Sequence, residues 1–275
     1  MGKYTFIVFI ALLGMACSGS KDDGTNSVKF DTFKKDTVYN LSSSADSPSL
    51  KVHVVAELPV SCQNRDVLVQ MQKLVSNTVI GNDTAASTPT STLELYVQKC
   101  VNDYKSLEKE YTLLKDTMTE GNIVPNSFNW KINLNGAVTF VDKGILCYQA
   151  ETQSYTDGDH LSSFIRSYNI IVKEGRVIGL NDIFSDGYED VITSSIINKL
   201  KEQCKCDNLS SFGFFDEDEI CPSQNFSIDN DGITFIYNPG DIALNSLGII
   251  KVQLSYQELA VVLNPETIIK DFIKD

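Results

Sequence analysis

The amino-acid sequence predicts an α+β protein with two subdomains, each a mainly antiparallel sheet packed with helices. Apolar and polar residues alternate in several separate stretches, which is the period of half-buried strands. Between these stretches lie three segments with apolar residues at helical spacing, 65–80, 92–117 and 188–203. The elements follow one another as strand, helix, helix and strands, and then as strands, helix and strands. This order favours an α+β architecture.

The first residues of the chain predict export. Lys3 supplies a short positive region, and Phe6–Met15 is an apolar run of about ten residues, too short to span a bilayer. Cys17 follows small residues, a pattern that resembles the lipobox of bacterial lipoproteins, in the looser Bacteroidetes-like form with Gly14 in place of Leu. We expect residues 1–16 to be a lipoprotein signal peptide and Cys17 to be the lipid anchor. The alternative is an ordinary secretory signal with an incidental cysteine.

Residues 17–47 are predicted to form a flexible tether behind the lipidated cysteine. The stretch is polar without a hydrophobic period, and only Val28–Asn40 alternates enough for an edge strand. Lys21-Asp22-Asp23 resembles the short acidic export signal of some Bacteroidetes lipoproteins. We therefore expect an outer-membrane lipoprotein that faces either the periplasm or the cell surface.

The charge of the chain limits the classes of partner. The formal net charge is −13 at pH 7, which argues against nucleic acid or an anionic lipid surface as the main partner. The acidity either suits a basic partner or serves solubility alone.

The N-terminal subdomain is assigned to residues 48–154. We expect a strand over 50–58 that Pro59 ends and a helix over 65–80 that Gly81 stops. A long helix should follow, from a cap at Ser91 or Thr92 to about Thr117. A strand from Phe128 comes next and, after a turn at Asp142-Lys143-Gly144, a strand over 145–155. Asn135-Gly136 predicts a hairpin turn, with one bent strand through Val141 as the alternative. His53 has a polar-facing position, which predicts a solvated or hydrogen-bonded side chain.

The C-terminal subdomain is assigned to residues 155–275. We expect a strand through Phe164 and Val172 that reverses at 174–176, followed by a helical turn over 180–184. A hairpin of 225–228 with 233–237, a strand over 248–256 and a closing helix over 265–273 should end the chain. Between these parts we expect a helix over 188–203, whose inward residues are Val191, Ile192, Ile196, Ile197 and Leu200. The loop over 207–222 contains an acidic run, Asp216–Glu219, which we interpret as solvated.

Cysteine usage agrees with export. Apart from Cys17, six cysteines are candidates for up to three disulfides, in one of the 15 pairings that six cysteines allow: Cys62, Cys100, Cys147, Cys204, Cys206 and Cys221. A metal site would need CxxC pairs or histidine partners. Cys204-Lys205-Cys206 has a different spacing, and the chain has only two histidines. We therefore predict neither a metal nor a cofactor.

The most suggestive polar segment is Asp157-Gly158-Asp159-His160. Two carboxylates and an imidazole are suitable metal ligands, and an Asp-His pair is able to activate a serine such as Ser162 or Ser163. However, adjacent residues of an extended chain point to opposite faces, and Asp-Gly-Asp is ordinary turn chemistry. We interpret the segment as a turn, and we keep a binding role for it as a hypothesis.

Several segments together resemble a known family. They are the strand from Ile145-Leu146 to Tyr155-Thr156, Gly158 and His160, Gly175-Arg176-Val177-Ile178-x-Leu180-x-Asp182-Ile183-Phe184, Phe235-x-Tyr237-x-Pro239, Asp241-Ile242-Ala243, Gly248 and Val252–Tyr256. This set resembles the C-terminal domain of unknown function in lysozyme-binding anti-sigma factors, which also occurs beside a peptidoglycan deacetylase domain. Residues 50–147 resemble, more loosely, its preceding companion domain. The chain departs from the family at Asp157 and Asp159 in the turn and at Leu244, where the family has Tyr.

The resemblance implies a non-catalytic envelope lipoprotein that binds a lysozyme-like protein or a cell-wall component such as peptidoglycan. We find neither a sigma-binding region nor the deacetylase's metal-binding histidines, so those activities are not implied. A basic partner such as lysozyme would suit the net charge. One alternative is an envelope hydrolase that acts on cell-wall glycan through paired carboxylates such as Asp157 and Asp159. Another is a structural subunit of a surface assembly, which predicts a sizeable exposed apolar patch.

Overall fold

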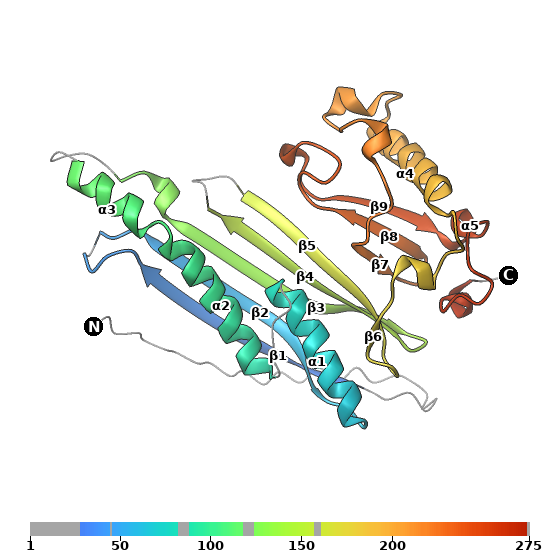
Figure 1. Cartoon of the computed structure of the whole chain (residues 1–275), viewed down its shortest axis with the longest axis horizontal. Helices are drawn as coiled ribbons and strands as arrows, with labels where there is room; N and C mark the ends of the chain where they lie inside the picture. The colour runs from blue at the N-terminus through green and yellow to red at the C-terminus, as the bar shows by residue number, and fades with distance from the viewer. Residues whose placement is uncertain (1–27, 45, 82–87, 118–123, 157–160, 274–275) are drawn as a thin grey trace. The chain divides into compact units, whose positions relative to one another are not determined.

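The computed structural model describes residues 28–44, 46–81, 88–117, 124–156 and 161–273 (Figure 1). Six strands form one sheet, in this order across it: β1 (Lys29–Asn40), β2 (Ser49–Ser61), β3 (Trp130–Asp142), β4 (Ile145–Tyr155), β5 (Leu161–Ile171) and β6 (Arg176–Val177). A second sheet contains β7 (Phe226–Ile228), β8 (Gly232–Tyr237) and β9 (Ile250–Ser255). The α-helices are α1 (Arg65–Ile80), α2 (Pro89–Lys105), α3 (Glu108–Thr117), α4 (Glu189–Cys204) and α5 (Tyr256–Leu259). The predicted α+β class is confirmed.

The chain divides into two compact units. Unit 1 is Met1–Ala137 with Ala150–Ser162, and unit 2 is Val138–Gln149 with Ser163–Asp275. β1 pairs with β2 in antiparallel fashion, as do β7 with β8 and β8 with β9, whereas β2 and β3 are parallel. A parallel pair needs a long crossover connection, and α1 to α3 occupy the chain between β2 and β3.

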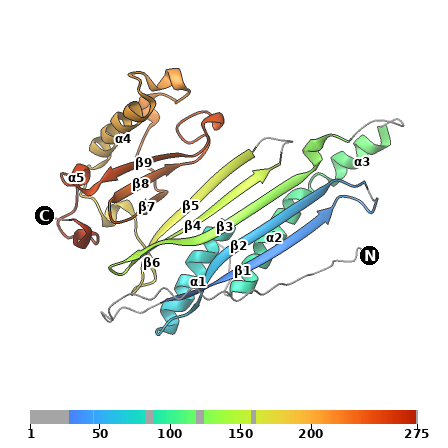
Figure 2. The same ribbon diagram turned by 180° about the vertical axis from the view of Figure 1, so that it is seen from behind.

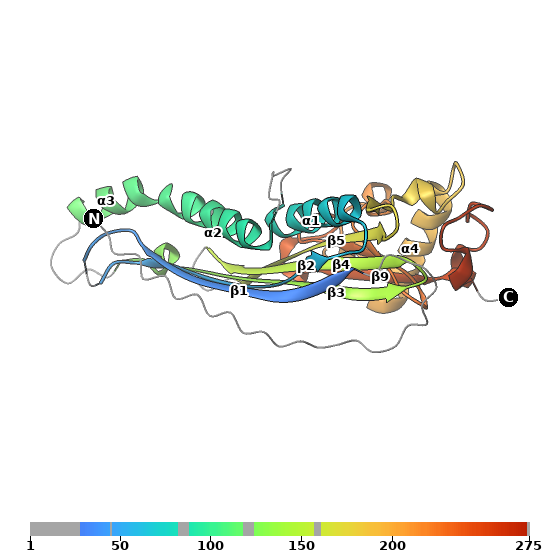
Figure 3. The same cartoon turned by 90° about the horizontal axis from the view of Figure 1, so that it is seen from below.

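In unit 1 the helices cover one face of the sheet. Figure 3 shows α1 and α2 on one side of β1 to β3, and Figure 2 shows the same strands from the side without helices. Alternation explains this arrangement, because Val52, Val54 and Leu58 of β2 are buried while Lys51 and His53 are exposed. The exposed side, here called the open face, presents Lys34, Asp36, Lys51, His53, Lys131 and Asn135.

The predicted helix boundaries are partly right. α1 has the predicted bounds, with Asn64 as its N-cap and Gly81 in the left-handed conformation, φ 79°, at its end. α2 begins earlier than predicted, because Thr88 is its N-cap and Pro89 its first residue. The long helix predicted to Thr117 is in fact two helices. Ser106 ends α2, where its hydroxyl donates to the Asp103 carbonyl at 2.6 Å and so competes with the helical hydrogen bonds.

Two of the predicted strand ends are wrong. β2 continues through Pro59 to Ser61, and Pro59 lies beside a register irregularity in β1 and beyond the last pair of β2 with β3, where its missing N–H is tolerated. Asn135-Gly136 is not a hairpin turn but part of β3, paired in parallel with Val55-Ala56, as the bent-strand alternative predicted. The turn at Lys143-Gly144 is confirmed, with both φ angles positive.

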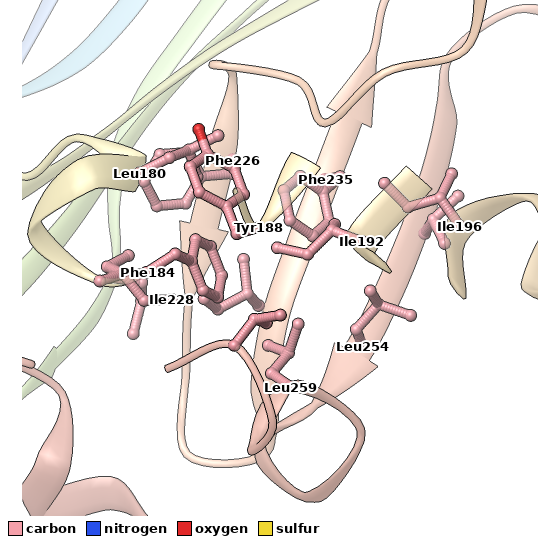
Figure 4. Close-up of a cluster of buried hydrophobic side chains, with 14 of the residues drawn as sticks. Leu180, Phe184, Tyr188, Ile192, Ile196, Phe226, Ile228, Phe235, Leu254 and Leu259 are labelled. Atoms are coloured by element: carbon pink, nitrogen blue, oxygen red, sulfur yellow. The ribbon is translucent and has the colours of Figure 1, made fainter. Parts of the chain in front are cut away.

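In unit 2 a continuous apolar core lies between α4, the second sheet and the C-terminal turns. Figure 4 shows ten of its labelled side chains, from α4, β7, β8 and β9 and from the segments that flank them: Leu180, Phe184, Tyr188, Ile192, Ile196, Phe226, Ile228, Phe235, Leu254 and Leu259. The buried face of α4 is narrower than predicted, since Val191 is 41% exposed. The closing helix predicted over 265–273 is wrong. Only a 3-10 turn, Lys270–Phe272, forms there, because Pro265 and the β-branched Thr267-Ile268-Ile269 disfavour an α-helix.

Three asparagine side chains satisfy backbone groups where β5 faces the second sheet in unit 2. Asn169 donates to the Phe226 carbonyl at 2.8 Å and accepts from the Ile228 amide at 2.9 Å. The side chain of Asn238, which follows β8, reaches back to β5: it accepts from the Ile165 amide at 2.7 Å and donates to the Ile165 carbonyl at 3.1 Å. Asn225 contacts the same strand, through the Ser167 amide and the Ile165 carbonyl at 2.8 Å each. At this edge, side-chain amides thus satisfy the backbone groups that a neighbouring strand would otherwise satisfy.

Candidate binding surface

Two of the predicted site elements lie outside the described residues. They are the lipid anchor Cys17 and the turn Asp157, Gly158, Asp159 and His160. Their roles remain predictions. Within the described ranges, no group of three or more His, Cys, Asp or Glu side chains is placed to hold a metal ion. The search for long apolar helices, over the same ranges, found none suited to crossing a membrane.

The six remaining cysteines are free thiols in the structure, so the predicted disulfides are not formed there. Cys100 in α2 and Cys147 in β4 are buried, and burial raises the pKa of both thiols, that of Cys100 to about 11. Cys147 lies 3.4 Å from the Ser167 hydroxyl. Cys62 is half-buried and Cys221 is exposed. Cys204 and Cys206 are both half-buried and lie two residues apart at the end of α4.

The prediction for His53 is confirmed. Its Nδ1 lies 2.6 Å from a carboxylate oxygen of Asp36 on the neighbouring strand, and both side chains are at least half exposed. The pairing follows directly from the register, which places His53 opposite Asp36. An exposed strand pair of this kind has an ordinary structural explanation.

An apolar patch lies on two loops of unit 2, far apart in the sequence. The first loop contains the 3-10 turn η3 (Leu209–Phe212), and the second contains η5 (Asn245–Leu247). They are joined by backbone hydrogen bonds, from the Phe215 amide to the Ile242 carbonyl and from the Leu244 amide to the Gly213 carbonyl, each 2.9 Å. A bridge between Phe214 and Ala243 lies between these bonds.

Gly213 brings the side chains of the two loops together. It has φ 94°, which favours glycine, and a Cβ there would lie 3.3 Å from a Leu244 methyl group and 3.8 Å from one of Leu247. The two leucines therefore cover the turn that follows Phe212. All three side chains remain solvent-accessible, with Phe212 48%, Leu244 56% and Leu247 40% exposed. We call Phe212, Leu244 and Leu247 the Leu244 patch.

Carboxylates adjoin the Leu244 patch on both loops. On the first, Asp216, Asp218 and Glu219 are exposed and follow directly after Phe215. On the second, Asp241 is exposed and precedes Ile242, the hydrogen-bond partner of Phe215. Among the residues that the structure describes, Glu217 is the member of the acidic run with an ion-pair partner, Lys201 at 2.7 Å. We call these exposed carboxylates, Asp216, Asp218, Glu219 and Asp241, the acidic border of the patch.

The acidic border belongs to the more acidic unit. Residues 138–149 and 163–275 contain 10 Lys and Arg against 19 Asp and Glu, a formal net charge of −9 out of the −13 of the whole chain.

The second loop is firmly anchored by hydrogen bonds at its start. The backbone N–H of Asn238 donates to the Asp241 carboxylate at 2.7 Å, and the buried Tyr237 hydroxyl donates to the Cys221 carbonyl at 2.7 Å. Burial raises the pKa of Tyr237, so this donor stays protonated.

Sequence reasoning found the acidic run but missed the patch. Phe212, Leu244 and Leu247 stand in loops, where no strand or helix period marks a face. The one available signal was Leu244 itself, an aliphatic residue where the resembled family has Tyr. A long-range pairing of two loops could not be read from either loop alone.

Comparison with known proteins shows the fold but no activity. Residues 181–257, which include the Leu244 patch, match a family model described as a protein of unknown function, DUF3298. A crystal structure of a DUF3298 family member from Bacteroides fragilis has a TM-score of 0.79 and 22% sequence identity, covering 90% of this chain and 98% of that one. A DUF3298 family protein from Pseudomonas aeruginosa has a TM-score of 0.54 and 14% identity, covering 86% and 95%. No match was found among curated proteins.

Proposed function

We propose that this chain is a non-catalytic binding module of the cell envelope, held at the outer membrane through lipidated Cys17, whose unit 2 binds a lysozyme-like protein. A cell-wall component such as peptidoglycan is the alternative ligand. The observation that carries the proposal is the Leu244 patch with its acidic border. Apolar centres with polar rims are typical of protein-binding surfaces.

Charge decides which protein suits the surface. Exposed carboxylates such as Asp216 and Asp218 repel acidic partners and attract cationic ones, and they accelerate the encounter most at low salt. Lysozyme-like proteins are strongly cationic. The resemblance to the C-terminal domain of lysozyme-binding anti-sigma factors supports the same class of partner. The apolar side chains would then supply the contacts that exclude water at the centre of the complex.

The test is lysozyme binding by the purified protein at low and at high salt. We expect saturable binding that weakens with salt. Leu244→Ala should weaken it about tenfold, the effect of losing a contact worth about 1.4 kcal/mol. The matched control is Val261→Ala. This residue is 82% exposed, belongs to the same unit and is separated from the Leu244 patch by the whole of β9. It should bind like the parent protein.

Two results would overturn the proposal. One is equal loss of binding in Leu244→Ala and Val261→Ala, which would show that the patch is not the contact. The other is release of soluble fragments from peptidoglycan that disappears in an Asp157→Asn, Asp159→Asn variant. That result would establish the hydrolase instead. Pull-down on intact peptidoglycan, with the same Leu244 and Val261 variants, separates a cell-wall ligand from a protein ligand.

A further inference from the structure

A pair of cysteines at the end of α4 has a geometry that the other cysteines lack. Cys204 is the last residue of the helix, Lys205 follows in the left-handed conformation with φ 53° and ψ 46°, and Cys206 comes next. The Cys206 amide donates to the Lys201 carbonyl at 3.1 Å and the Lys205 amide to the Glu202 carbonyl at 3.2 Å. These two bonds form a Schellman ending, in which glycine usually occupies the left-handed position.

The conformation of Lys205 fixes the separation of the two cysteines. The distance between Cα atoms two apart depends on the φ and ψ of the residue between them. For helical angles of either hand it is about 5.5 Å. Cysteines joined by a disulfide usually have Cα atoms about 4.4–6.8 Å apart, most often near 5.5–6 Å. The Cα separation that Lys205 imposes therefore falls within the range of disulfide-bonded cysteines.

The thiols are also accessible to a reagent. Both side chains are half-buried and pack against the core of unit 2. Cys206 lines an open hollow of about 320 Å³ together with Lys201, Glu202, Lys205 and Asp207. Because Cys206 lines this hollow and Cys204 does not, Cys206 is the thiol that a small reagent reaches first.

We propose that Cys204 and Cys206 are a dithiol site that exchanges with small disulfides and closes reversibly into an intramolecular disulfide. The Cys206 thiolate attacks one sulfur of a disulfide R–S–S–R, forms a Cys206–S–S–R bond and releases one thiolate. The Cys204 thiolate then attacks the Cys206 sulfur, forms the Cys204–Cys206 bond and releases the second. Two protein thiols are oxidised, one small disulfide is reduced to two thiols, and the protons lost by the cysteines pass to the released thiolates.

The test is to equilibrate the reduced protein with glutathione and glutathione disulfide at increasing ratios of disulfide, and then to alkylate and measure peptide masses. We expect the peptide that contains both cysteines to lose its two alkylation sites together. In a Cys204→Ser variant the second step is blocked, so the glutathione adduct at Cys206 should rise at least about tenfold over the parent protein. Exposed Cys221 is the internal control, because without a partner thiol it forms only the mixed adduct.

If a variant fails to fold, the alkylation pattern of the parent protein is sufficient to test the proposal. Joint loss of both alkylation sites supports the proposal. It is overturned if Cys204 and Cys206 stay alkylated at every ratio, or if a stable glutathione adduct at Cys206 accumulates in the parent protein while Cys204 remains a free thiol.

Discussion

The open face of unit 1 exposes mainly polar side chains to solvent, whereas the Leu244 patch of unit 2 exposes apolar ones. The open face is mainly polar and lies on paired strands. Lys51 and Lys131 stand side by side there and His53 pairs with Asp36, and Val38, which is 61% exposed, is an apolar exception. The Leu244 patch is apolar and lies on two loops joined by backbone hydrogen bonds. A regular strand fixes the side of the sheet to which each residue points, so solvation alone explains the open face. The exposed apolar side chains on the anchored loops are the ones that the proposed partner would cover.

The largest contrast between the units lies in how their strand edges are satisfied. In unit 1, β1 pairs with β2 through backbone groups, whereas β5 and the second sheet of unit 2 are joined by the side-chain amides of Asn169, Asn225 and Asn238. Replacing Asn169 with Ala would remove the side-chain hydrogen bonds of the Phe226 carbonyl and the Ile228 amide in a buried strand, and we expect a loss of about 2–4 kcal/mol of stability. Hydrogen exchange in β7 and β8 should accelerate accordingly.

Trp130 makes this prediction selective. It is the only tryptophan, and it packs against Tyr104 in unit 1 with ring centroids 5.4 Å apart, so its fluorescence reports on that unit. Asn169→Ala should change exchange in β7 and β8 more than it shifts the Trp130 unfolding transition. Asn230→Ala, in an exposed turn of unit 2, is the matched control and should change neither. Equal exchange in both variants would show that the Asn169 amide is dispensable.

The second contrast is charge. Neutralising the acidic border with Asp216→Asn, Asp218→Asn and Glu219→Gln should weaken lysozyme binding about tenfold at low salt and much less at high salt, mainly through slower association. Lys51→Ala with Lys131→Ala removes two charges from the open face and should leave the affinity unchanged or slightly higher. Association kinetics at two salt concentrations measure both effects. If both sets of changes had the same effect, net charge and not the border of the patch would set the affinity.

The sequence predicts the regular strands and helices of unit 1 better than the loop contacts of unit 2. β2 and α1 could be predicted because their apolar periods and the stop at Gly81 are local signals. Asn135-Gly136 misled, because parallel pairing with Val55-Ala56 overrides a turn preference that is only local. The asparagine contacts and the Leu244 patch join residues tens of positions apart, and nothing in the composition of either partner indicates the other.

A smaller effect is expected from pH in unit 2. The Glu258 carboxylate accepts from the Ser255 amide and hydroxyl at 2.7 Å each and from Lys199 at 3.1 Å, which lowers its pKa below the ordinary 4.5. A lowered pKa contributes stability above pH 4.5, and this contribution is lost as the pH falls through the folded-state value. Glu258→Gln should therefore reduce stability at pH 7 and flatten its decline in acid, measured by denaturant unfolding across the acid range. A parallel decline in parent and variant would contradict this.

The smallest effect should come from the ion pair of the open face. His53 and Asp36 are 50% and 73% exposed, and pairs of this kind contribute little because water screens them. We expect Asp36→Asn to change the stability of unit 1 by less than about 0.5 kcal/mol, and to leave both the Trp130 transition and lysozyme binding unaltered. Denaturant unfolding followed by Trp130 fluorescence measures the first, and the binding assay measures the second. A loss of binding in this variant would give the open face a functional role and remove the distinction between a solvated strand face in unit 1 and a binding surface in unit 2.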